Sequence, residues 1–243
     1  NYDGAQGGQY NHYGFYASGN NVEVHLHDVY SYGEYGSQYN YGAYVSNGAH
    51  VYLKNGKYYG RYGDRAYGVW ATGSNTVVDV YYIDARGWYA DYNYGYYNEK
   101  GAWSKLKKGY YYGYYGEGNG DYCYGIYNEE ATLEAHHVHG YGYQCNNENY
   151  GLYNYYGNSA TIPTEATVKY GYFRGYKGGT AYGVYNYGSG ATLHTHSTYG
   201  YGDEPSGSSY GLYNGNEATG YVYDGYYRGY KGANCYGIFN NQS

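Results

Sequence analysis

The fold is decided by a stretch in the middle of the chain that reads YGIYNEEATLEAHHV, from Tyr124 to Val138. It opens with a Tyr-Gly-apolar-aromatic tetrad, passes through Asn128 and a polar turn, and then alternates apolar and polar residues. The tetrad returns at intervals of 26 to 32 residues and starts nine times, at Tyr13, Tyr41, Tyr67, Tyr94, Tyr124, Tyr150, Tyr182, Tyr210 and Tyr236. A motif that recurs with this period predicts a repeat architecture.

The segment that follows each tetrad has the period of a β-strand. In the first repeat Glu23, His25 and His27 alternate with valine and leucine, so polar and apolar residues are expected on opposite faces. The 44 glycines and the β-branched residues argue against helices of useful length. Three short strands and three turns fit into about 28 residues, which is one rung of a β-helix. We therefore expect an all-β chain in which residues 1–243 form a single parallel β-solenoid domain of about eight coils.

The composition favours a narrow rod over a globular domain. Glycine and tyrosine supply 44 and 52 of the 243 residues, whereas isoleucine, leucine and valine together supply only 24. So few aliphatic side chains cannot fill the core of an ordinary domain of this length. A net charge of −6 is too small for a typical disordered chain. In a solenoid each coil packs only against its neighbours and needs few inward side chains.

Two stretches resemble the YGIYN-type repeats of bacterial surface adhesins and fibre proteins. They are the stretch quoted above and YGVYNYGSGATLHTH, from Tyr182 to His196. Those repeats are similar to the pectin-lyase-like superfamily of right-handed β-helices. The resemblance covers nearly the whole chain and implies a right-handed parallel β-helix with a structural or adhesive role. The chain departs from the usual pattern because positions that are commonly serine or threonine there are tyrosine here.

Stacking of the repeats predicts a column of aromatic rings along the rod. If the third tetrad residue points inward, the glycine at the second position and the aromatic residue at the fourth point outward. Stacked coils would align the fourth residues about 4.8 Å apart, where offset rings stabilise each other by around 0.5–1.5 kcal/mol per pair. The predicted contact strip consists of Tyr16, Tyr44, Trp70, Tyr97, Tyr127, Tyr153, Tyr185 and Tyr213, followed by Phe239. The first tetrad tyrosine shares the inward parity and is expected at a corner, where its hydroxyl reaches water or a carbonyl.

Three roles fit this strip. Stacked tyrosines stiffen a rod that lacks aliphatic side chains. A flat aromatic strip beside a glycine-floored groove also suits sugar rings or another subunit, and redox chemistry through dityrosine cross-links or charge hopping is a third role. An exposed aromatic face of this size seldom stays unpartnered in a soluble monomer.

No catalytic site, metal site or cofactor is predicted. The histidine pairs are His25 with His27, His136 with His139, and His194 with His196. Each pair supplies fewer ligands than a zinc site needs, so we expect surface histidines, with a metal shared across a subunit contact as the alternative. The carboxylates are scattered, and no pair on adjacent rungs is expected for acid and base work; they include Asp79, Asp84, Asp91, Glu129, Glu130, Asp203 and Glu204. Because the motifs of nucleophilic and phosphate-binding enzymes are missing too, we expect that the protein is not an enzyme.

The three cysteines form no even disulfide framework. Cys123 and Cys235 each precede a tetrad and would lie four coils apart, roughly 19 Å, which is too far for a disulfide. A bond from Cys123 to Cys145 would need a loop excursion. We therefore expect three small buried or turn residues, with a disulfide to another subunit as the alternative.

Charge and hydropathy narrow the choice of partners and compartment. The 14 lysines and arginines are outnumbered by 20 aspartates and glutamates, which argues against nucleic-acid binding, and the cluster from Lys105 to Lys108 is expected to be a solvated turn. No run of 18 apolar residues occurs, so no membrane span is predicted. The chain starts at Asn1 and lacks methionine, which indicates a processed, secreted protein.

The two ends of the chain favour self-assembly. It finishes one tetrad into a ninth coil, with YGIFNNQS, and begins with a partial coil, NYDGAQGGQYN. Open solenoid edges pair with another chain, and head-to-tail stacking gives a filament. We therefore predict an extracellular structural protein that forms a fibre with tyrosine-rich faces. The alternative is a glycan-binding adhesin or tail-fibre module that uses the contact strip.

Overall fold

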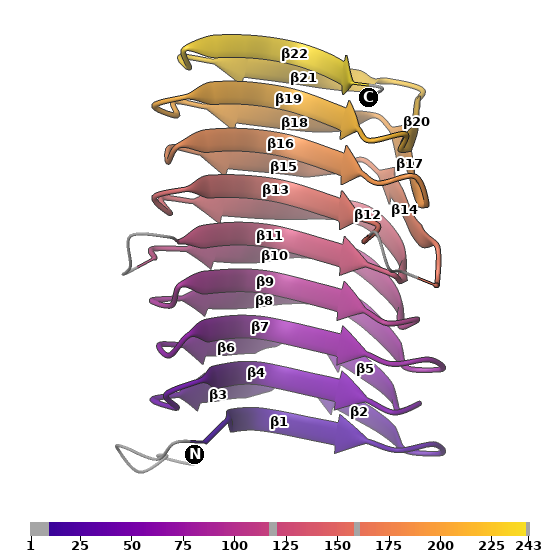
Figure 1. The fold of residues 1–243 in the computed structure, drawn as a ribbon. Helices are drawn as coiled ribbons and strands as arrows, with labels where there is room; N and C mark the ends of the chain where they lie inside the picture. Colours follow the sequence, from indigo (N-terminus) through magenta and orange to yellow (C-terminus); the bar gives the residue numbers. More distant parts are fainter. Residues whose placement is uncertain (1–9, 117–120, 158–160, 242–243) are drawn as a thin grey trace.

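The computed structural model describes residues 10–116, 121–157 and 161–241, whose regular structure consists of β-strands. The strands wind as a parallel β-solenoid of about eight turns, with consecutive coils stacked along one axis (Figure 1). The predicted fold class, an all-β parallel solenoid, is confirmed.

The strands form two parallel sheets. The first sheet contains one strand per coil, each built around a tetrad: β1 (His12–Ser18), β4 (Tyr39–Ser46), β7 (Arg65–Thr72), β9 (Tyr92–Glu99), β11 (Tyr122–Glu129), β13 (Glu148–Tyr155), β16 (Thr180–Tyr187), β19 (Ser208–Gly215) and β22 (Asn234–Asn241). The second sheet contains β2 (Glu23–His27), β3 (Tyr30–Glu34), β5 (His50–Lys54), β6 (Lys57–Arg61), β8 (Val77–Trp88), β10 (Trp103–Tyr114), β12 (Thr132–Tyr143), β14 (Thr164–Lys169), β15 (Tyr172–Tyr176), β17 (Ala191–His196), β18 (Thr198–Asp203), β20 (Thr219–Val222) and β21 (Gly225–Tyr230). Equivalent tetrad residues pair from coil to coil, so Tyr124 lies between Tyr94 and Tyr150.

A residue with positive φ bends each coil within the second sheet. In β8, β10 and β12 two segments run as one strand, and Tyr82, Lys108 and His137 bend it with φ of 58°, 57° and 54°. In an earlier coil Asn55, with φ of 52°, separates β5 from β6. Each coil therefore has the three predicted segments, although two of them belong to the same sheet.

The core lies between the two sheets, and the third tetrad residue points into it as predicted. These residues are fully or almost fully buried: Ala43, Val69, Tyr96, Ile126, Leu152, Val184 and Leu212. They meet alternate residues of the second sheet, among them Leu53 and Leu106. In the first coil Val24 and Leu26 face the same core while His25 is exposed, which confirms the predicted alternation.

One column of the second sheet alternates large and small side chains from coil to coil. Its successive register positions are Ser31, Tyr58, Ala85, Tyr111, Gly140, Phe173, Gly200 and Tyr227. The ring of Phe173 covers Gly140, where a Cβ atom would come within 2.8 Å of the ring. Aromatic residues on every second coil thus fill a narrow core that the few aliphatic side chains leave unfilled.

The tetrad glycine faces inward, so the predicted outward glycine and the glycine-floored groove are wrong. A Cβ atom on Gly125 would lie 2.2 Å from the backbone nitrogen of Tyr141 in the second sheet. Conversely, a Cβ atom on Gly142 would lie 2.3 Å from the backbone nitrogen of Tyr150 in the first sheet. The two sheets therefore touch backbone to backbone along a glycine seam, formed by facing partners in the second sheet and by Gly14, Gly42, Gly68, Gly95, Gly125, Gly151, Gly183 and Gly211.

The glycine seam also breaks the alternation of the tetrad strand. In the register of β11 with its neighbours, Tyr124 and Ile126 have partners but Gly125 between them has none. Gly95 and Gly151 are skipped in the same way, so the strands stay in register while the inward and outward alternation breaks between Gly125 and Ile126. As a result the first and fourth tetrad residues, Tyr124 and Tyr127, meet on the outer face of the sheet with ring centroids 5.0 Å apart.

Asparagines that follow the tetrads form a ladder along the later coils, buried from Asn98 to Asn186 and exposed at Asn240. Nδ2 of Asn98 donates to Oδ1 of Asn128 at 2.8 Å. The bond repeats at 2.9, 2.8, 2.7 and 2.9 Å through Asn154, Asn186, Asn214 and Asn240. The other amide hydrogen of Asn154 goes to the carbonyl of Thr192 at 3.1 Å. The ladder therefore satisfies polar groups that would be costly inside the solenoid.

Replacing Asn154 by alanine is expected to destabilise the solenoid by roughly 2–4 kcal/mol, because Asn128 and Asn186 both lose a buried partner. Urea unfolding followed by circular dichroism measures the change in the free energy of unfolding. The matched control is Asn240→Ala, at the exposed end of the ladder, which removes a bond to Asn214 alone and is expected to cost less than about 1 kcal/mol. Equal losses in the two variants would contradict a cooperative ladder.

Candidate functional site

The first tetrad tyrosines form an unbroken stack on the outer face of the first sheet. Nine rings run from Tyr13 to Tyr236 with centroids 4.8 to 5.1 Å apart and planes within 12° of parallel. They do not lie at a corner, so that prediction is wrong. The hydroxyl of Tyr150 donates to Oε2 of Glu148 at 2.6 Å, which shows how a buried phenol of this column finds a partner.

The predicted contact strip forms a second column beside the first. Its rings, from Tyr16 through Tyr213 to Phe239, have centroids 4.7 to 5.4 Å apart. Most neighbours stack, but Trp70 meets Tyr44 and Tyr97 edge-on, at 81° and 88°. The predicted alignment is confirmed, and the role of the column as a contact strip stays a prediction; the aligned residues are Tyr16, Tyr44, Trp70, Tyr97, Tyr127, Tyr153, Tyr185 and Tyr213.

The contact strip packs against the first column, and the rings of both columns are less exposed to solvent than expected. Tyr16, in the first coil, is 55% exposed, whereas Tyr97 is only 9% exposed. Most first-column rings meet the strip edge to face, as Tyr150 does with Tyr153 at 4.7 Å and 88°. Burial raises the pKa of the Tyr94 phenol well above its ordinary value of 10.0. The two columns thus form a second apolar cluster outside the main core.

Two carboxylates of this face lie on adjacent rungs, where none were expected. Glu99 and Glu129 are paired in register, and the hydroxyl of Tyr97 lies 3.1 Å from Oε2 of Glu99 and 3.0 Å from Oε2 of Glu129. Glu99 is 5% exposed, accepts a hydrogen bond from Thr72 at 2.8 Å and pairs with Lys100 at 3.3 Å. The Glu99 carboxylate oxygens already have partners and are shielded from solvent. This carboxylate is therefore suited to holding the tyrosine columns in place.

Replacing Glu129 by glutamine is expected to raise the melting temperature at neutral pH. Burial, with further contributions from Glu99 and Glu130, raises the pKa of the Glu129 carboxyl. A raised carboxyl pKa means that its contribution to stability is complete below the ordinary value of 4.5 and is lost as the pH rises through the folded-state pKa. Glutamine has no charge to bury and still accepts the Tyr97 hydrogen bond.

Thermal unfolding at neutral pH and below pH 4.5 checks this prediction. The Glu129→Gln variant should match the native chain at the acidic pH and exceed it at neutral pH. Glu165→Gln is the control, since it makes the same charge change on an exposed residue of β14 and should leave both temperatures unchanged. A lower melting temperature for Glu129→Gln at neutral pH would contradict the assignment.

The histidines stack on tyrosines of neighbouring coils. The ring pairs are His25 with Tyr52 at 4.2 Å, His194 with Tyr221 at 4.6 Å and His196 with Tyr223 at 4.3 Å. His136 and His139, the third predicted pair, lie on opposite sides of the bend that His137 makes in β12. Within residues 10–116, 121–157 and 161–241, no three His, Cys, Asp or Glu side chains lie close enough together to hold a metal ion.

Cys123 and Cys145 form a disulfide, so the expectation of three unbonded cysteines is wrong. Their Cα atoms are 5.6 Å apart although 22 residues separate them in sequence. Cys145 lies in the turn that leads into β13, and β13 pairs directly with β11, where Cys123 faces Asn149. The turn of the next coil therefore brings the two sulfurs together without any loop excursion. Cys235 is a free, exposed cysteine.

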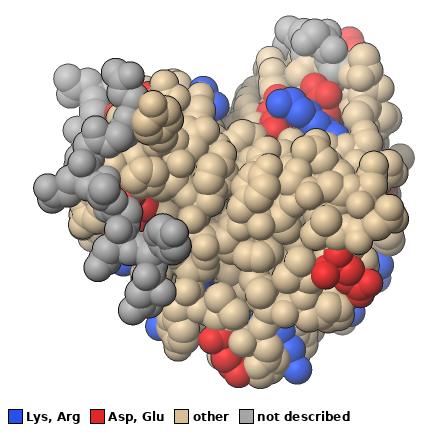
Figure 2. Space-filling model, turned by 90° about the horizontal axis from the view of Figure 1, so that it is seen from below, with Lys and Arg blue, Asp and Glu red and all other residues tan. Residues whose placement is uncertain are grey.

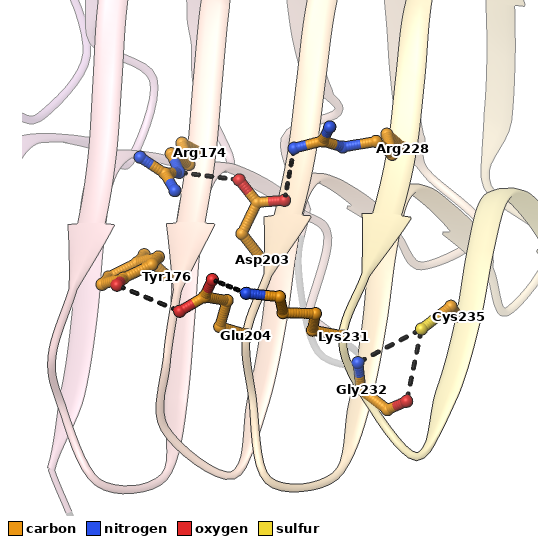
Figure 3. Close-up of polar contacts among 8 residues, drawn as sticks. All are labelled: Arg174, Tyr176, Asp203, Glu204, Arg228, Lys231, Gly232 and Cys235. Atoms are coloured by element: carbon orange, nitrogen blue, oxygen red, sulfur yellow. Dashed lines mark hydrogen bonds and ion pairs between the residues drawn. The ribbon is translucent and has the colours of Figure 1, made fainter.

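Ion pairs tie successive coils together on the outer face of the second sheet. Asp203 lies between two arginines, accepting from Nε of Arg174 at 2.8 Å and from Nη2 of Arg228 at 3.1 Å (Figure 3). Beside it Glu204 pairs with Lys231 at 2.8 Å. On the same face an open hollow of about 430 Å³ lies between Arg86 and Arg174 and is lined by tyrosines. These arginines are largely neutralised by their own carboxylates.

Comparison with known proteins adds no relative to this picture. No family model, no curated protein and no solved structure matches the chain. The resemblance to YGIYN-type repeats therefore stays a prediction. No helix in the described part of the chain is long and apolar enough to cross a membrane.

Proposed function

We propose that this protein is an extracellular structural protein, the subunit of a fibre that grows by head-to-tail stacking of solenoids. The observation that carries the proposal is the coil-to-coil register, in which equivalent tetrad residues pair throughout the first sheet, so that one solenoid can stack on another as its own coils do. Within the chain β22 covers Leu212, which is 3% exposed, whereas Ile238 on β22 is 58% exposed. In a head-to-tail fibre, the first coil of a second copy would cover Ile238.

The two outermost coils present matching columns. At one end Tyr236, Ile238 and Phe239 continue the tyrosine stack, the core and the contact strip, and at the other end Tyr13 and Tyr16 occupy equivalent columns. At the end that carries β1, seen from below, the part not covered by grey atoms consists mostly of residues other than Lys, Arg, Asp and Glu, which lie towards its margin (Figure 2). Open parallel edges with matching columns favour a heterologous contact, which repeats into a filament.

Side-by-side contacts and the compartment fit the same proposal. Large aromatic residues are exposed along the rod, among them Tyr82, Tyr170 and Tyr223. Exposed aromatic surface of this kind is typical of faces that bind a partner, here a neighbouring rod. The disulfide between Cys123 and Cys145 supports an oxidising, extracellular compartment.

Sedimentation velocity and electron microscopy of the full chain at rising concentration test the proposal. The native chain should form filaments, and Ile238→Asp should stay monomeric because it places a charge in the end contact. Tyr82→Asp is the matched control, since Tyr82 is similarly exposed but lies at a corner of a middle coil, and it should still form head-to-tail filaments. Native monomers at every concentration, or assembly of Ile238→Asp like the native chain, would reject the proposal.

A second candidate function is glycan binding by the contact strip, in an adhesin or tail-fibre module. It is favoured by the half-buried rings of Tyr127 and Tyr153, stacked 4.7 Å apart, whose edges form part of a continuous aromatic strip that a glycan can lie along. Binding to a glycan array should be lost in the double variant Tyr127→Ala with Tyr153→Ala. Glycan binding that survives this double change would exclude the strip as the binding surface.

A further inference from the structure

One outward column of the second sheet is rich in lysine and histidine and contains no carboxylate. Its register positions, coil by coil, are His27, Lys54, Tyr81, Lys107, His136, Lys169 and His196. We call this set the basic column. In a chain of net charge −6, a column that has three lysines and no carboxylate is a local reversal of sign.

The three lysines of the basic column recur on every second coil. Lys54 lies on β5, Lys107 on β10 and Lys169 on β14, with one coil between each pair. At about 4.8 Å per coil their spacing is roughly 10 Å. The carboxylates nearby lie beside the column: Asp28 pairs with His27, and Asp79 pairs with His50 at 3.0 Å. The lysines of the column therefore keep their charge available for a ligand.

A hollow of about 470 Å³ opens along the early part of the column. Its lining includes His27, Lys54 and Lys107 of the basic column, the ring of Tyr52, and Asp79, whose carboxylate is paired with His50. Lys105 also lines it, and its ammonium lies 4.0 Å from the centroid of the Trp103 ring. Cationic side chains that alternate with aromatic rings in an elongated hollow suit a polymer of ring-shaped, negatively charged units.

We propose that the basic column binds a linear acidic polysaccharide that carries one carboxylate or sulfate per disaccharide. The lysine spacing of roughly 10 Å is about the length of a disaccharide in an extended chain, so one anionic group would meet each lysine. A nucleic-acid strand carries a phosphate about every 3.4 Å and would leave most of its charges unpaired on this column. The site lies on the second sheet, away from the contact strip, and does not depend on assembly of the fibre.

Histidine makes this binding stronger in mild acid. His136 faces Lys107 on β10, Lys169 on β14, and Glu134 and His137 on its own strand. Burial, followed by Lys169, holds the pKa of His136 below its ordinary value of 6.5, so it is neutral at pH 7. A bound polyanion favours the charged imidazole and draws in a proton, which raises the affinity as the pH falls.

Calorimetric titration of the full chain with hyaluronate oligosaccharides tests the proposal, with neutral dextran and a single-stranded oligonucleotide of equal length as comparisons. Hyaluronate should bind, and its affinity should fall as the salt concentration rises from about 50 to about 200 mM, because salt screens the contacts between the lysines and the carboxylates. The triple variant Lys54→Ser, Lys107→Ser, Lys169→Ser should lose roughly tenfold or more in affinity. The control triple variant Lys57→Ser, Lys100→Ser, Lys177→Ser makes the same change in net charge outside the column and should bind like the native chain.

The results of this titration test the basic column independently of the proposed fibre and of the contact strip. Equal affinity of the two triple variants, no preference over dextran, or tighter binding of the oligonucleotide would each overturn the proposal. Circular dichroism of both variants confirms that they are folded. Because none of the six lysines lies in β22 or in the contact strip, filament formation and binding by the strip are measured independently of this result.

Discussion

Replacing Gly125 by alanine is expected to prevent the chain from folding into a stable solenoid. The new methyl group would lie 2.2 Å from the backbone nitrogen of Tyr141 and 2.6 Å from the carbonyl oxygen of Gly151. Both are backbone atoms, so no side-chain rotation relieves the clash and the two sheets must separate at the glycine seam. We expect a loss of more than about 3 kcal/mol, beyond the range of ordinary core overpacking.

Circular dichroism and urea unfolding measure this effect. Gly157→Ala is the matched control, because its Cβ atom would have no neighbour closer than 3.6 Å. The control variant should unfold at nearly the same urea concentration as the native chain. A Gly125→Ala protein that folds with native stability would show that the sheets do not meet backbone to backbone.

Alkaline pH is expected to unfold the protein in one cooperative step driven by its buried tyrosines. Burial raises the pKa of the Tyr94, Tyr124 and Tyr150 phenols well above the ordinary value of 10.0. With folded-state pKa values above the unfolded ones, the stability that these neutral phenols contribute is complete below pH 10.0 and is lost as the pH rises further. Because several phenols share this behaviour, their losses add and the transition should be steep.

Tyrosine labelled with carbon-13 at Cζ follows this transition by NMR. The resonance of Tyr124, assigned through Tyr124→Phe, should keep its neutral chemical shift until the circular dichroism of the sheets is lost. A Tyr124 resonance that titrates near pH 10.0 in a folded protein would contradict the burial of the first column. The Tyr124→Phe variant itself should stay folded to a slightly higher pH, since it has one buried phenol fewer.

Periodicity was enough to predict the solenoid, the inward third residue and the alignment of the contact strip. Those features depend on the spacing of tetrads and on alternation, and both can be counted in the sequence. The orientation of the tetrad glycine could not be predicted from a regular alternation, because the alternation breaks at Gly125 and resumes at Ile126. The same break places Tyr124 in the outer stack instead of at the expected corner.

The asparagine ladder, the disulfide and the basic column leave traces in the sequence, but the spacing of the tetrads alone does not predict them. Asparagine follows the tetrad in the later repeats, and a repeated polar residue beside an inward position is typical of a ladder such as the one from Asn98 to Asn240. The disulfide could not be predicted from sequence separation, because Cys145 lies in the turn of the next coil and the pairing of β13 with β11 brings that turn beside Cys123. The basic column could not be predicted, because its lysines are far apart in sequence and only the register of the strands aligns them on one face.

The measurement that tests the central claim most directly is X-ray fibre diffraction from aligned filaments of the full chain. Parallel strands that stack along the solenoid axis, in rods joined end to end, place a reflection at about 4.8 Å along the filament axis. We predict that this reflection lies on the meridian. A 4.8 Å reflection on the equator would mean that the rods assemble side by side, and a chain that forms no filaments to diffract would contradict the proposed head-to-tail fibre.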